Sequence, residues 1–136
     1  MNTHFVAVVL AFLAVGPAVA QRDADADRLC EPGSHAEQRA CLVAEADKSE
    51  KRLAQEESAA RIALLKMNEN EPERTRAVEE FDRSVLEFRR FRSAQCEFVA
   101  SLAYGGNGQG DRRLLCQIDL NNARIRYLPA ALRSAV

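Results

Sequence analysis

Histidine is scarce in this sequence, and tryptophan is absent. The chain has two histidines, and only His35 lies beyond the apolar first twenty residues. A hydrolytic triad needs a histidine between a nucleophile and a carboxylate, whereas a lone histidine in the first turn of a helix is usually a surface residue. The acidic group Glu79, Glu80 and Asp82 fits the solvated face of a helix, with no second acidic cluster opposite it. We therefore predict that the protein is not an enzyme and has no cofactor.

Glycine and proline are also scarce between residues 34 and 104, and no segment alternates polar and apolar residues as a strand does. Residues 34–71 contain neither glycine nor proline and are rich in Ala, Glu, Lys, Arg, Gln and Leu, which favour helix. Ser34 and Glu37 open this stretch with the S-x-x-E pattern of a capping box. Pro72 suits the first turn of a second helix, where its missing N–H is not needed. These absences predict an all-α domain.

Three helices are expected, over residues 34–67, 72–103 and 111–128, with Asp111 as a cap of the third. Two long helices joined by a short break fold back on each other, so the predicted fold is an antiparallel helical hairpin plus a shorter third helix. The expected apolar positions are Leu53, Ile62, Leu64 and Leu65 in the first helix, Val78, Phe81, Val85, Phe88, Phe91, Cys96, Phe98, Val99 and Leu102 in the second, and Leu114, Leu115, Ile118, Ile125 and Leu128 in the third.

A long hydrophobic run is missing as well. The apolar stretch from Phe5 to Val15 has eleven residues, fewer than the roughly 20 that span a bilayer. Gly16-Pro17 and the small-x-small sequence ending at Ala20 follow, as in a cleavable secretory signal; the alternatives are a membrane anchor or a core helix. The expected organisation is a signal peptide over 1–20, a flexible N-terminus and turn over 21–33, a helical domain over 34–130 and a tail over 131–136. The protein is then periplasmic or secreted, with no membrane anchor after cleavage.

All four cysteines, Cys30, Cys41, Cys96 and Cys116, lie beyond this signal, and an even number in a short exported chain predicts two disulfides. Their wide spacing does not suit zinc, so no metal site is expected. The helix layout places Cys96 and Cys116 at similar heights on either side of a glycine-rich turn. We therefore prefer Cys30–Cys41 with Cys96–Cys116. The rival arrangement, which links the N-terminal cysteines to the other two, stays open.

The connection between the second and third helices holds four of the six glycines within residues 104–110. It lacks both a preceding strand and the Gly-Lys-Ser/Thr of a phosphate loop, which excludes nucleotide binding. It is either a plain connector or a loop, clamped by a disulfide, that enters a partner's cleft. The arginines flanking it are either paired with Glu87 and Glu97 or form an anion-binding surface. The partner-binding candidates are Arg89, Arg92, Gly105, Gly106, Asn107, Arg112 and Arg113.

The charges nearly cancel, with 19 basic and 20 acidic residues and a net charge of −1. Proteins that bind nucleic acid carry a basic patch or stripe and usually a basic balance. The composition therefore predicts that the protein does not bind nucleic acid.

The cysteine layout and its surroundings resemble those of the lysozyme inhibitor LprI-like N-terminal domain family of exported bacterial proteins. The resemblance covers about residues 28–130. It rests on the segment from Phe88 to Cys96, the Gly-Gly loop, and the residues around Cys41 and Cys116. Phe88 stands where the family usually has Trp, and Ser93 where it usually has an acid, so the chain is a divergent member. The resemblance implies structural roles for Phe88, Phe91, Arg92, Arg124 and Leu128.

The same resemblance implies a function. The family name points to a protein that binds a lysozyme and inhibits it. The alternative is a structural or accessory envelope protein that binds another partner and inhibits nothing.

Overall fold

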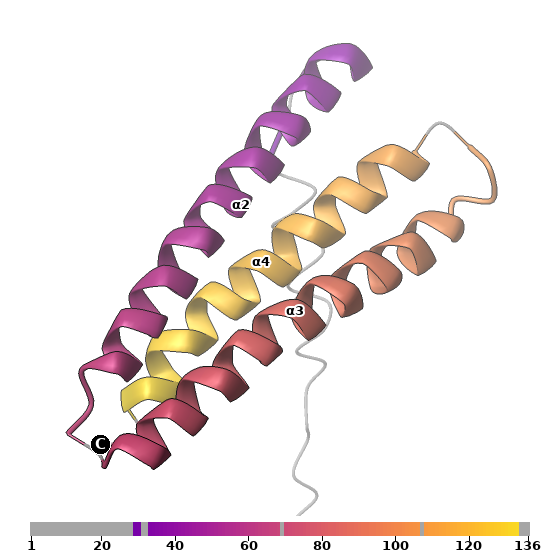
Figure 1. Cartoon of the computed structure of the whole chain (residues 1–136). Helices are drawn as coiled ribbons and strands as arrows, with labels where there is room; N and C mark the ends of the chain where they lie inside the picture. The colour runs from indigo at the N-terminus through magenta and orange to yellow at the C-terminus, as the bar shows by residue number, and fades with distance from the viewer. Residues whose placement is uncertain (1–28, 31–32, 69, 107, 134–136) are drawn as a thin grey trace, which may run out of the picture.

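A computed structural model describes residues 29–30, 33–68, 70–106 and 108–133, and within these ranges the chain is all helical without a strand. The helices are α2 (His35–Leu65), α3 (Glu71–Ser101) and α4 (Gln109–Arg133) (Figure 1). The predicted fold class is confirmed. The expected signal peptide and most of the expected flexible N-terminus lie outside the described residues.

The first two helices begin where their capping residues dictate. Ser34 is the N-cap of α2: its Oγ accepts the Glu37 N–H at 3.4 Å, and the Glu37 carboxylate accepts the Ser34 N–H at 2.8 Å. This is the predicted capping box. Asn70 caps α3, with its Oδ1 accepting the Glu73 N–H at 3.2 Å. Helix α3 therefore starts one residue before Pro72.

Both ends of α4 differ from the prediction. The helix begins at Gln109, so Asp111 lies in its first turn and does not cap it. The Asp111 carboxylate instead pairs with His35 and Arg39 of α2, at 3.2 and 2.7 Å. The helix also continues through Pro129 to Arg133, because proline's fixed φ is compatible with helix and its missing N–H costs one hydrogen bond near the end. Residues 131–133 of the expected tail are therefore helical.

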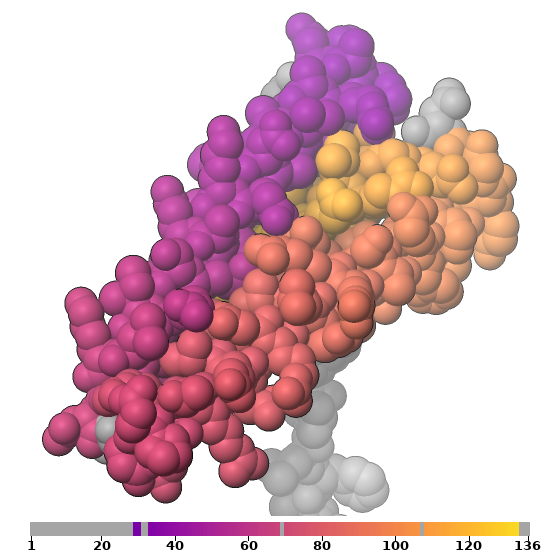
Figure 2. Space-filling model, viewed as in Figure 1, coloured from indigo at the N-terminus to yellow at the C-terminus, as the bar shows by residue number. Residues whose placement is uncertain are grey.

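The ion pairs between helices give the direction of each helix. Glu50, Glu57 and Arg61 of α2 pair with successively earlier residues of α3, which is the order of an antiparallel pair. Helix α4 runs parallel to α2 and lies between α2 and α3 (Figure 1). In the space-filling view, α4 is visible between the other two helices toward the end that carries the α3–α4 loop (Figure 2).

The core is a thin apolar seam along the three helices. Within the described ranges, the buried apolar residues are Leu42, Leu53, Ala60, Val78, Cys96, Ala100, Ile118, Ile125 and Leu128. The seam is narrower than the pattern predicted, because Phe91, Phe98 and Leu102 are 54%, 58% and 41% exposed. Ile62 and Leu65 of α2 are also about half exposed. Phe91 is exposed because the next residue, Arg92, points toward the interior of the bundle instead.

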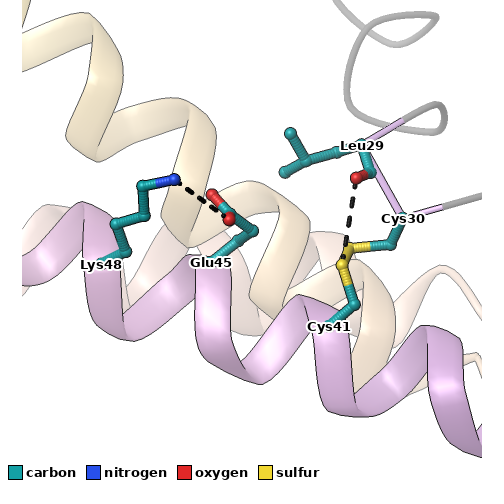
Figure 3. Close-up of a disulfide and its surroundings, with 5 residues drawn as sticks. All are labelled: Leu29, Cys30, Cys41, Glu45 and Lys48. Atoms are coloured by element: carbon teal, nitrogen blue, oxygen red, sulfur yellow. Dashed lines mark hydrogen bonds and ion pairs between the residues drawn. A yellow bond between two sulfur atoms is a disulfide. The ribbon is translucent and has the colours of Figure 1, made fainter.

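The two disulfides have the preferred connectivity. Cys30–Cys41 and Cys96–Cys116 have Cα–Cα distances of 5.8 and 5.5 Å. Figure 3 shows Cys30–Cys41 holding the chain before α2 against that helix, with the Leu29 carbonyl oxygen 3.9 Å from the Cys41 Sγ. The second disulfide joins α3 to α4 beside the glycine-rich loop.

Candidate functional site

A buried carboxylate, Glu57, connects all three helices. Its residue is only 6% exposed, and it accepts hydrogen bonds from Arg89 of α3 at 3.1 Å and from Arg124 of α4 at 2.8 Å. Arg124 also donates to the Ser84 hydroxyl oxygen at 3.2 Å. Each charge in this group therefore has an opposite partner, which a carboxylate in a protein interior requires.

A second polar group lies one to two helical turns away. Arg92 donates to the Glu50 carboxylate and to the Asn121 side-chain oxygen. Asn121 is 1% exposed, and its amide nitrogen donates to Ser49 Oγ at 3.0 Å and to Glu50 at 3.2 Å. Burial by itself would raise the pKa of Glu50. The hydrogen bond and charge of Arg92, helped by Asn121 and Arg89, outweigh burial and hold that pKa below its ordinary value.

The Phe88 ring joins these two groups. The guanidinium carbons of Arg124 and Arg92 lie 4.7 and 5.8 Å from its centroid. Both distances are within the range of a cation–π contact. The structure thus brings together three residues of the family resemblance, Phe88, Arg92 and Arg124, and places Leu128 in the core. Phe91 lies outside this cluster, with an exposed ring.

This polar cluster was not predicted from the sequence. Ser49, Glu57 and Asn121 are polar residues buried by contacts between helices, whereas helical periodicity reports only contacts along one helix. One indication of this cluster was available in the sequence, because Arg92 and Arg124 both belong to the family resemblance. No buried side-chain nitrogen or oxygen in the described part of the chain lacks a hydrogen-bond partner. The cluster therefore links all three helices without leaving a buried polar atom unpaired.

A different surface is formed by the last turn of α3, the following loop and the first turn of α4. We call residues 98–113, apart from the undescribed Asn107, the loop end. The Cys96–Cys116 disulfide closes its base, and Arg113 binds the Glu97 carboxylate through two nitrogens at 2.6 and 2.8 Å. The hydrogen bond from Arg113 lowers the pKa of Glu97. These contacts fix the position of the loop on the helices.

Most of the arginines that flank the loop end are paired with acids. Arg89, Arg90, Arg92 and Arg113 pair with Glu57, Glu87, Glu50 and Glu97. The partners Glu87 and Glu97 are those that the sequence suggested. Among the described residues, no acid pairs with the exposed side chain of Arg112. The loop end contains Asp111, Arg112 and Arg113, and its charges balance when the adjoining Glu97 is counted.

The loop end also exposes a tyrosine that the sequence analysis did not single out. Tyr104 is 93% exposed, and its backbone is in the left-handed region with φ +48°, followed by Gly105 with φ +80°. Phe98 in the last turn of α3 and Leu102, the C-cap of that helix, are exposed just before it. The candidates Gly105 and Gly106 are exposed beside it, with the Gly106 N–H donating to the Ala103 carbonyl at 3.0 Å. Tyrosine is enriched at protein interfaces, where its ring is apolar and its hydroxyl is polar.

A hollow of about 190 Å³ adjoins the loop end, between α4 and the start of α2. Leu42 and Leu115 supply its apolar walls, and Gln38, Asp111 and Arg112 its polar ones. Its volume is below the range usual for small-molecule sites, so it suits at most a single side chain of a partner.

No group of histidine, cysteine or acidic residues in the described ranges could hold a metal ion. None of the described helices is apolar enough over a sufficient length to cross a membrane.

The fold and this surface define a small, disulfide-linked, all-helical domain with a structural polar interior and an exposed loop end. The chain belongs to the lysozyme inhibitor LprI family, whose model matches residues 30–128. No curated protein and no solved structure matches the chain significantly. The family resemblance seen in the sequence is thereby confirmed.

Proposed function

We propose that this protein is an exported, protein-binding inhibitor of a lysozyme, and that the loop end is its contact surface. The family match over residues 30–128, almost the whole described domain, is the observation that carries the proposal. Two disulfides suit a protein that works in an oxidising compartment, in the periplasm or outside the cell.

The choice of the loop end rests on three of its properties. It is anchored by the Cys96–Cys116 disulfide and the Glu97–Arg113 pair, so little ordering is needed on binding. It exposes apolar and aromatic side chains, which dominate binding energy at protein interfaces. Its charges largely cancel, so it would not repel a basic target, as many lysozymes are.

The arginine candidates divide into two groups under this proposal. Arg112 has an exposed side chain, and Arg113 lies in the contact surface while pairing with Glu97. Arg89 and Arg92 act through the polar cluster instead, because their guanidinium groups already bind Glu57 and Glu50. Substituting Arg89 or Arg92 should therefore change stability first and binding second.

The test is inhibition of a panel of lysozymes of different structural types by the purified, oxidised protein. We expect inhibition of at least one type at submicromolar concentration, together with a one-to-one complex in size-exclusion chromatography. The reduced and alkylated protein is the matched control and should lose inhibition. Absence of inhibition and of complex formation at micromolar protein would reject the proposal. Binding to another envelope protein without inhibition would favour an accessory role.

A further inference from the structure

We propose that Tyr104 is the residue with which this protein blocks its target, by inserting its ring into the saccharide-binding cleft of the lysozyme. This inference rests on the proposed function and adds the mode of inhibition, which is competition with the sugar substrate. It singles out one side chain of the loop end, two residues after Leu102, the C-cap of α3; Figure 1 shows the loop that joins α3 to α4.

The first observation is that the fold does not account for this side chain. Tyr104 is 93% exposed, the most exposed of the large apolar and aromatic residues in the described ranges. Its left-handed backbone, φ +48°, is unfavourable for a residue with a Cβ, and glycine adopts it freely. A glycine here would turn the chain at lower cost. The tyrosine therefore brings a side chain that the fold itself does not use.

The second observation is that this side chain projects from a fixed support. The Tyr104 N–H donates to the Ser101 carbonyl at 3.1 Å, and the Gly106 N–H donates to the Ala103 carbonyl at 3.0 Å. Below these turns the Cys96–Cys116 disulfide ties α3 to α4. A ring presented on a preorganised turn loses little conformational entropy when it binds. Phe98 and Leu102 provide exposed apolar surface around its base.

The third observation is the chemistry that the loop end offers to a cleft. A glycosidase cleft binds sugar rings and carries two carboxyl groups beside the scissile bond. A tyrosine ring has a flat apolar face and one hydroxyl, so it can occupy a sugar subsite and donate a hydrogen bond to a carboxylate. Arg112, whose exposed guanidinium has no acid partner in the described ranges, supplies the cation that complements the acidic cleft.

The chain contains a matched control for this inference. Tyr127 of α4 is also exposed, at 67%, but it lies in the interior of a helix and outside the loop end. A nonspecific effect of removing a surface tyrosine would appear equally at both positions. A site-specific role would appear only at Tyr104.

The experiment measures the inhibition constant Ki of the full exported protein on a lysozyme that it inhibits, with a soluble chitooligosaccharide as substrate. Wild type should raise the apparent KM without changing kcat. Tyr104→Gly should raise Ki on the order of 30-fold or more, as expected for an interface hot spot. Tyr104→Phe should raise Ki about tenfold through loss of one hydrogen bond to a charged group. Tyr127→Ala should leave Ki within about twofold, because a surface position outside the hot spot contributes little.

Each outcome has a definite meaning. Tyr104→Gly places a glycine at a left-handed backbone position, so the thermal midpoint of the variant should be no lower than that of wild type. An unchanged midpoint shows that a higher Ki comes from lost binding and not from lost folding. Inhibition that lowers kcat at unchanged KM, or a Ki for Tyr104→Gly within threefold of wild type, overturns the inference and leaves the proposed function standing. A wild-type protein that inhibits no lysozyme overturns both.

Discussion

The guanidinium of Arg124 lies 4.7 Å from the centroid of the Phe88 ring while its Nε donates to the Glu57 carboxylate at 2.8 Å. One arginine of α4 thus contacts an aromatic ring of α3 and a buried acid of α2. The interior of this bundle is joined by directional polar contacts as well as by apolar packing. Loss of any one of these polar contacts should therefore lower the stability of the bundle.

Replacing Phe88 by alanine should destabilise the protein by about 2–3 kcal/mol. The ring is only partly buried, so the loss of stability from burial is smaller than for a fully buried phenylalanine. The substitution also removes the contacts of the ring with Arg92 and Arg124. Urea denaturation at pH 7 measures the change. Phe98→Ala is the control, because Phe98 is 58% exposed, and it should cost less than about 0.5 kcal/mol. Equal losses for the two variants would contradict this account of the core.

Replacing Glu57 by glutamine should cost about 3 kcal/mol. The substitution leaves Arg89 and Arg124 without their carboxylate, and Arg124 is largely buried with a side chain 12% exposed. Glu80→Gln provides the comparison, because the exposed Glu80–Arg83 pair lies on the surface of α3. That variant should stay within about 0.5 kcal/mol of wild type. A small effect of Glu57→Gln would show that the buried acid is not needed for stability.

Stability should fall in acid, in part through Glu50. Because its folded-state pKa lies below the ordinary value of 4.5, the folded protein binds fewer protons than the unfolded chain near that pH. The stabilisation is complete above about pH 5 and is lost as the pH falls through the folded-state pKa. Hydrogen bonds from Ser34 and Arg113 also lower the pKa values of Glu37 and Glu97, so these two acids add to the loss of stability in acid.

Thermal unfolding between pH 7 and pH 3 measures this dependence. Glu50→Gln should be less stable than wild type at pH 7, and its midpoint should fall less between pH 5 and pH 3. Arg92→Gln should flatten the acid limb in the same way, because it removes the cation that lowers the pKa of Glu50. Parallel curves for wild type and both variants would exclude Glu50 as a contributor.

The two disulfides should have separable roles. They close loops with sequence separations of 11 and 20 residues, so the chain-entropy model gives each about 3 kcal/mol. Replacing either cysteine pair by serines should therefore lower stability by similar amounts. Only loss of Cys96–Cys116 should weaken inhibition at a temperature where both variants remain folded, because only that disulfide supports the loop end. Equal weakening by both variants would argue against this assignment.

The features that could be predicted from the sequence are those set by short segments. The Ser34–Glu37 capping box has a local pattern, so the start of α2 was predicted correctly. Cys96 and Cys116 flank one turn, and their pairing followed from the helix layout. The exposed state of Phe98 could not be predicted in this way. An apolar residue at helical spacing gives the same pattern whether or not another helix covers it.

The contacts that could not be predicted are those in which distant residues decide the outcome. Asp111 is a residue type that often caps helices, but its carboxylate instead contacts His35 and Arg39 of α2. Phe91 and Arg92 are adjacent, and the choice of which faces inward depends on Asn121 and Glu50. Tyr104 was missed because a single exposed aromatic residue produces no periodic signal.

The position of α4 between the other helices has a consequence for how the chain acquires its structure. Ser49 and Glu57 of α2 find their partners Asn121 and Arg124 on this last helix. A nascent chain that ends before residue 121 contains Glu57 and Arg89 but lacks Arg124, the more buried of the two cations that pair with Glu57. Cooperative folding must therefore wait until nearly the whole polypeptide has emerged. If the protein is exported as we propose, its chain would therefore cross the membrane before the three helices pack together.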